Sequence, residues 1–125
     1  MELSKLVDPM FQIALKKLSG QDLSAKVAFK LKGIVKRVNE ETAKYEEVRT
    51  EVLNRLGERD ENGKIIVQEN NSIKLSEENL QLFIKEMNQL MAAEVQVGNM
   101  AIHELSEKVT LTAHELLALD GIITE

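Results

Sequence analysis

Apolar residues recur every three or four positions over most of this chain, which is the pattern of amphipathic α-helices. The first such segment follows Asp8-Pro9, where an N-cap residue and a proline predict a helix start, and it ends at Ser19-Gly20. A longer segment runs from about Ser24 to Leu56 with no proline and one glycine. Four of its apolar residues are seven positions apart: Leu31, Val38, Tyr45 and Val52. This spacing predicts one apolar seam along a long helix.

The segment after the long helix predicts a β-hairpin at its tip. Gly57 stands where helices commonly end in the left-handed conformation, and a polar turn follows it. Residues 64–68 and 72–75 are short runs of β-forming residues, separated by a polar linker. Ser76 then predicts the N-cap of a return helix that extends to about Glu94 and lies antiparallel to the long helix.

The end of the chain predicts a small closing segment. Residues 95–111 include strand-forming runs, part of which we expect to pair as small strands. Thr112 and Glu115 form a capping box, which predicts a short terminal helix. The expected fold class is therefore mainly α: a long antiparallel helical hairpin with a β-hairpin tip, a short N-terminal helix and a small C-terminal strand and helix segment. We expect residues 1–125 to form a single domain.

The composition is that of a soluble globular protein. Of the 125 residues, 43% are hydrophobic and 30% are charged, and no apolar run is long enough to span a bilayer. The N-terminus shows no signal-peptide pattern, so we expect a cytoplasmic protein, in the host-cell cytoplasm if it is phage-encoded. The chain has no cysteine, which excludes disulfides, thiolate metal sites and cysteine nucleophiles.

Charge is divided unevenly along the chain. Residues 1–38 carry eight Lys or Arg and three Asp or Glu, whereas residues 39–125 carry eight and eighteen. Lys26, Lys30 and Arg37 form a stripe on the long helix that could hold a phosphate-bearing ligand or an acidic partner. The alternative interpretation is a solvated face that complements the protein's own acidic residues. The net charge of −5, with three Phe and one Tyr as the only aromatics, argues against a nucleic-acid or membrane partner.

Residues with catalytic or metal-binding chemistry form no recognised motif. There is no GxGxxG, P-loop or GxSxG run, so we expect no enzyme, no catalytic residue and no cofactor. His103 and His114 are the only histidines, and their spacing does not enforce a metal site, so we expect no bound metal.

The N-terminal third contains more apolar surface than a single helix pair can bury. The first helix has a broad apolar face, and Phe29 lies on the side of the long helix opposite the apolar seam. Such surface favours self-association, and we expect a homo-oligomer. The residues that we expect in its interface are Phe11, Leu15, Leu18 and Phe29.

Three runs follow one another in order along the chain: GERDENGK at 57–64, NQLMAAEVQV at 88–97 and LTAHELLALD at 111–120. Together they resemble small proteins of unknown function carried by phages and prophages of Gram-positive bacteria. The resemblance spans most of the chain and implies a viral origin and a helical hairpin with a β-hairpin tip. It includes no catalytic motif and implies no site residues.

The lack of catalytic motifs, the helical hairpin and the uneven charge favour a binding function. The leading hypothesis is a non-enzymatic phage or prophage protein that binds a host or viral protein, for instance to inhibit a host defence or transcription component. A second hypothesis is an oligomeric binder that sequesters a nucleotide signal, with Lys26, Lys30 and Arg37 on its phosphates. A third is a structural or assembly factor of the virion.

Overall fold

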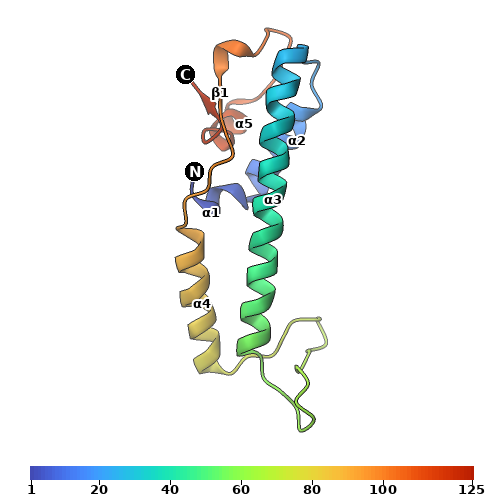
Figure 1. Cartoon of the computed structure of the whole chain (residues 1–125), viewed down its shortest axis with the longest axis vertical. Coiled ribbons are helices and arrows are strands. Elements are labelled where there is room, and N and C mark those ends of the chain that lie inside the picture. Colours follow the sequence, from blue (N-terminus) through green and yellow to red (C-terminus); the bar gives the residue numbers. More distant parts are fainter. The chain divides into compact units, whose positions relative to one another are not determined.

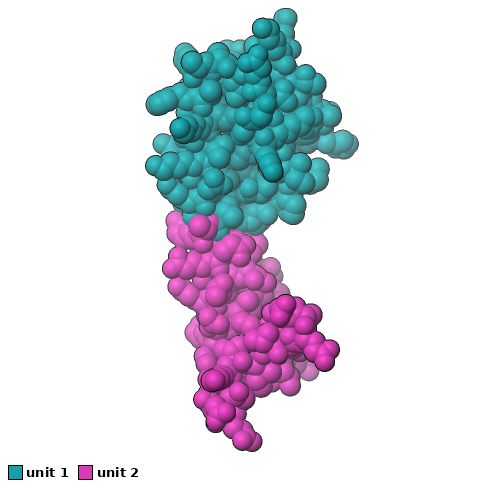
Figure 2. Space-filling view, turned by 90° about the vertical axis from the view of Figure 1, so that its right-hand side faces the viewer, with its two compact units in different colours: residues 1–42, 93–125 teal, residues 43–92 magenta.

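The structure, a computed structural model that describes residues 1–125, is mainly α-helical (Figure 1). Its elements are α1 (Leu3–Leu6), α2 (Pro9–Ser19), α3 (Ala25–Leu56), α4 (Glu77–Met91), β1 (Met100–Ala101), the 3-10 turn η1 (Ile102–Glu104), α5 (Ala113–Ala118) and β2 (Ile123–Thr124). The chain divides into two compact units, unit 1 with residues 1–42 and 93–125 and unit 2 with residues 43–92 (Figure 2). The long helix α3 contributes to both units.

The helix starts follow the capping residues that the sequence shows. Asp8 accepts a hydrogen bond from a backbone N–H in the first turn of α2, and Ser76 does the same for α4. Thr112 and Glu115 form the capping box of α5. The prediction of a mainly α fold with a long helix packed on a return helix is confirmed. None of the helices combines the length and the hydrophobicity that crossing a bilayer requires.

Unit 1 is closed by its C-terminal segment, which lies against the N-terminal helices. Helix α2 packs on α5, and Glu2 forms an antiparallel backbone bridge with Glu94. Strand β1 pairs with β2 in parallel, with Met100 opposite Ile123. All these segments contribute buried apolar residues to one core, among them Leu3, Leu6, Phe11, Leu15, Leu18, Leu31, Val38, Val97, Met100, Leu119 and Ile122.

The C-terminal end of the chain differs from the sequence prediction. The short helix predicted after Thr112 is present as α5, but it stops at Ala118 and does not include the apolar residues Leu119, Ile122 and Ile123. The residues after the helix turn, so that Ile122 and Ile123 enter the core of unit 1 and β2 pairs with β1. Burial of these two side chains, together with the strand pairing, therefore replaces further helical turns.

The predicted β-hairpin at the tip is wrong. Residues 57–75 form two isolated antiparallel bridges, Arg59 with Ile65 and Val67 with Ile73, and no strand. Left-handed residues mark two turns, Gly63 with φ 77° and Asn71 with φ 65°. The stretch between these turns is too short for a continuous ladder, so the tip folds back on itself twice instead of once.

In unit 2, the last part of α3 and α4 form an antiparallel pair (Figure 1). Arg55 Nη2 donates to both carboxylate oxygens of Glu86, at 2.7 and 2.6 Å. Helix α4 ends at Met91, a few residues before the predicted end. Of the residues in unit 2, only Leu56 and Met87 are buried, so this unit encloses little core of its own.

Gly57 ends α3 for a reason other than the one its position suggests. Gly57 does not have the left-handed conformation predicted for it. Among the glycines, only Gly63 and Gly98 have positive φ. A Cβ at position 57 would lie 2.7 Å from Ile73 Cγ2, 2.9 Å from Ile65 Cδ1 and 2.9 Å from the backbone carbonyl oxygen of Leu53. Glycine is therefore required because both the tip and the last turn of the helix lie too close for a side chain.

Gly57→Ala is expected to lower the free energy of unfolding by about 1–3 kcal/mol, because the added methyl overpacks the contact with the tip. Gly33→Ala is the matched control, since Gly33 lies inside α3 and a Cβ there has nothing within 4 Å. It should raise the free energy of unfolding by about 0.5–1 kcal/mol through helix propensity. Urea denaturation measures both, and similar effects of the two substitutions would contradict the close contact at Gly57.

Candidate functional site

Three lysines of the basic N-terminal third are paired, within unit 1, with acidic residues of the C-terminal segment. The pairs are Lys5 with Asp120, Lys17 with Glu115 and Lys30 with Glu104. The uneven charge of the sequence is therefore partly neutralised inside the unit, where it holds the two ends of the chain together.

Two of these carboxylates have lowered pKa values. The hydrogen bond from Lys17 Nζ, at 2.8 Å, lowers the pKa of Glu115 to about 2, and the Thr112 backbone N–H contributes further. The pKa of Glu104 is also lowered, first by the hydrogen bond from Lys30 and then by one from a backbone N–H of β1. Each carboxylate therefore fixes both a lysine and a backbone turn.

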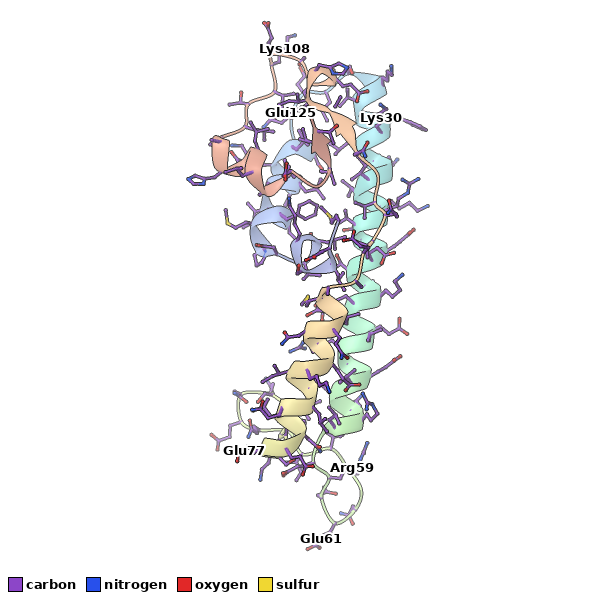
Figure 3. All side chains as sticks on the ribbon, turned by 90° about the vertical axis from the view of Figure 1, so that its left-hand side faces the viewer. Lys30, Arg59, Glu61, Glu77, Lys108 and Glu125 are labelled. Atoms are coloured by element: carbon purple, nitrogen blue, oxygen red, sulfur yellow. The ribbon has the colours of Figure 1, made fainter.

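The predicted basic stripe of Lys26, Lys30 and Arg37 is only partly free. Lys30, labelled on α3 in Figure 3, is held by Glu104. Arg37 Nη1 lies 3.1 Å from the position that a Cβ on Gly98 would take. Lys26 forms no ion pair. At Lys30, the contacts therefore fit the alternative interpretation, in which the basic face complements the protein's own acidic residues.

Three of the four residues predicted to self-associate are not on the surface. Phe11, Leu15 and Leu18 are buried in unit 1, where other segments of the same chain cover α2. The prediction is corrected for these residues, because the sequence shows an apolar face but not the segment that covers it. Phe29 alone is exposed, with 82% of its surface accessible.

Phe29 projects from α3 on the side opposite the apolar seam. Its neighbours one turn before and one turn after it are Ala25 and Gly33, both small. A Cβ on Gly33 would have nothing within 4 Å, so the surface beside the ring is open. A partner can therefore surround the ring and approach the helix closely.

Lysines surround Phe29 on this side of α3. Lys26 and Lys32 lie three residues before and after it, Lys36 lies two turns further along, and none of them forms an ion pair. Residues 23–39 contain five basic residues and no acidic one. We define the Phe29 face as the surface formed by Ala25, Lys26, Phe29, Lys32, Gly33 and Lys36.

A groove of about 400 Å³ opens between α2 and α3. On a helical wheel of α3, Lys32 lies between the groove residue Asn39 and Phe29, so the groove borders the Phe29 face. The groove combines apolar and polar side chains, which suits it to accept one side chain of a partner. It is lined by Gln12, Ile13, Leu15, Lys16, Ser19, Val35 and Asn39.

The two histidines, His103 and His114, are both exposed. No group of three His, Asp or Glu side chains is placed to hold a metal ion.

The chain matches no protein-family model, no curated protein and no solved structure. The chemistry of the Phe29 face is therefore the feature from which a function can be argued.

The lowered pKa of Glu115 predicts a loss of stability in acid. The ordinary carboxyl pKa of 4.5 applies to the unfolded chain, so the stabilisation is fully present above that pH and is lost as the pH falls towards about 2. Glu115→Gln removes this contribution. Its free energy of unfolding should lie below that of the wild type above pH 4.5 and approach it near pH 2.

Urea denaturation at a series of pH values measures this difference. Lys17→Met serves as the partner variant and should reduce the same pH dependence, because the hydrogen bond from Lys17 is the largest cause of the shift. A constant difference between wild type and Glu115→Gln over the whole range would contradict the prediction.

Proposed function

We propose that this chain is a non-enzymatic phage or prophage protein that binds an acidic surface of a host or viral protein through the Phe29 face. The observation that supports this proposal is the Phe29 ring, 82% exposed at the centre of unpaired lysines. Binding would block the surface that is occupied, for instance on a defence or transcription component in the host-cell cytoplasm.

The ring and the lysines make different contributions to binding. An aromatic side chain that leaves water and fills a pocket of the partner is worth about 2 kcal/mol or more, which makes it the main source of affinity. The unpaired cations Lys26, Lys32 and Lys36 accelerate the encounter with an acidic surface and select against basic partners. The adjoining groove can accept one further side chain of the partner.

An acidic protein fits this face better than other partners do. Two copies of the face would place lysines against lysines, which disfavours self-association there. A single aromatic ring offers little stacking surface for nucleic acid, and it is too small an apolar face for insertion into a bilayer.

The two other functional hypotheses make different predictions. A nucleotide bound at Lys26, Lys30 and Arg37 would have to compete with Glu104 for Lys30. Titration calorimetry with nucleotide signals identifies such binding, because a protein-binding module should release no heat with them. Detection of the chain in purified virus particles would instead indicate a structural or assembly factor.

Phe29→Ala is expected to weaken partner binding about 30-fold, which corresponds to about 2 kcal/mol, because it removes the apolar anchor. The free energy of unfolding should change by less than about 0.5 kcal/mol, since the ring is exposed. Affinity purification from lysate of a Gram-positive host identifies the partner, and calorimetry with that purified partner measures the affinity. Leu117→Ala is the matched control, because Leu117 is 70% exposed on α5, outside the Phe29 face.

Reversal of two charges, Lys26→Glu with Lys32→Glu, should slow association and reduce its dependence on salt. Stopped-flow measurements at several salt concentrations test this expectation. Recovery of the same proteins, with the same affinity, by wild type and Phe29→Ala would overturn the proposed binding face. A partner identified as RNA, DNA or membrane would overturn the proposed class of partner.

A further inference from the structure

The groove between α2 and α3 is elongated and has a helix on each side. On α2 it is lined by Gln12, Lys16 and Ser19, which follow one another at helical spacing along one face. Because seven residues of an α-helix extend about 10 Å, the groove follows α2 for about two turns. The opposite side is formed by Val35 and Asn39, one turn apart on α3.

The groove contains apolar surface that a partner can cover. Of its apolar lining residues, Leu15 is buried, Val35 is half-buried and Ile13 is 62% exposed. An apolar side chain that enters the groove would contact Leu15 and Val35 and remove part of Ile13 from water, which favours binding.

The polar groups of the groove are in large part already bonded within unit 1. Gln12 Nε2 donates to the backbone carbonyl of Leu6 at 2.7 Å, and Ser19 Oγ donates to that of Leu15 at 2.8 Å. The backbone of an extended peptide would therefore find few hydrogen-bond partners here. A helix bonds its own backbone groups and needs none. The groove thus favours a helical segment.

The other common modes of segment recognition do not fit this lining. Strand addition requires an exposed sheet edge, and a proline-rich segment requires a groove lined by aromatic rings. The lining residues come from two helices and include no aromatic side chain. A helix laid into a groove is the mode that remains.

Positive charge lies on both sides of the groove. Lys16 lines it from α2, and on the wheel of α3 Lys32 and Lys36 lie next to the groove residue Asn39. None of these three lysines forms an ion pair. A helix that binds here would meet cations on both of its flanks, so acidic side chains on those flanks would be favoured.

Three acidic residues are close to the groove in sequence, but none of them lines it. Asp8 accepts a hydrogen bond from the Met10 backbone N–H at the start of α2 and lines a different hollow. Asp22 lies in the connection between the two helices. On the wheel of α3, Glu40 lies beyond Lys36, on the side of Phe29. The charge at the groove itself is therefore positive.

We propose that the groove binds an amphipathic acidic helix of the partner protein, with one apolar side chain of that helix against Leu15 and Val35. Carboxylates one turn away from that side chain face Lys16 on one side and Lys32 on the other. This inference rests on the function proposed for the Phe29 face and names the partner segment that binds beside it. The exposed ring of Phe29, beyond Lys32 on the wheel, contacts a part of the partner next to the helix.

Ile13→Asp should weaken binding of the partner about 30-fold, because it places a carboxylate against the acidic helix and removes apolar surface from the groove. Met10→Asp is the matched control, since Met10 is 54% exposed on α2 and lines a different hollow. It introduces the same charge and should change the affinity by less than about two-fold. Calorimetry with the partner purified from lysate measures both. Equal effects of the two substitutions would overturn the inference.

A synthetic peptide of about 14 residues, held helical by a side-chain staple, tests the groove without the partner. It carries leucines on one face and glutamates on the others. Amide NMR spectra of the full chain should show saturable shift changes at residues that line the groove, such as Lys16 and Asn39. An unstapled peptide with two central prolines, which cannot form the helix, and a stapled peptide with lysines in place of glutamates should give no such changes.

The outcomes separate this inference from the proposed function. Phe29→Ala should weaken binding of the whole partner but leave the peptide in the groove, because the peptide covers the groove alone. No shift changes at the groove, or equal changes with the helical and the proline-containing peptides, would overturn the acidic helix. A groove that binds the helical peptide while Phe29→Ala leaves the affinity for the partner unchanged would support the helix and overturn the Phe29 face.

Discussion

The apolar seam of α3 must be covered over a helix of 32 residues, and the other elements are arranged around this requirement. A helix of that length extends about 48 Å, whereas α2 and α4 have 11 and 15 residues. No single element can therefore cover the whole seam. Unit 1 combines two ends of the chain to bury its part completely, and unit 2 has one helix and an irregular tip for the rest.

The basic residues of the N-terminal third fall into two groups, those that form ion pairs within unit 1 and those that do not. Lys5, Lys17 and Lys30 are paired with acidic residues of the C-terminal segment and help to hold that segment on the helices. Lys26 and Lys32 are unpaired and surround an exposed ring. The same excess of positive charge therefore contributes to closing unit 1 and to a surface that attracts acidic partners.

The features that could be predicted from the sequence are the local ones. Helix caps and apolar periodicity are each set by residues a few positions apart in sequence. The starts of α2, α4 and α5 and the seam of α3 therefore follow from the sequence alone. Pairing between β1 and β2 and burial of α2 depend on segments far apart in sequence, which no local pattern specifies. For the candidate site, the run of residues 23–39 without an acidic residue indicates the lysines around Phe29, whereas the acid that neutralises Lys30 could not be identified.

Unit 1 is discontinuous in sequence, because residues 43–92 leave it and the chain then returns to it. During synthesis from the N-terminus, all of unit 2 is made before residues 93–125 exist. The antiparallel helices of unit 2 bring its first and last residues to the same end of the helical pair. Unit 1 can therefore close without the entropy loss of ordering a long flexible loop. Until residues 93–125 have been made, the apolar faces of α2 and the start of α3 remain open to water. The nascent chain is therefore most prone to aggregation before this segment is available.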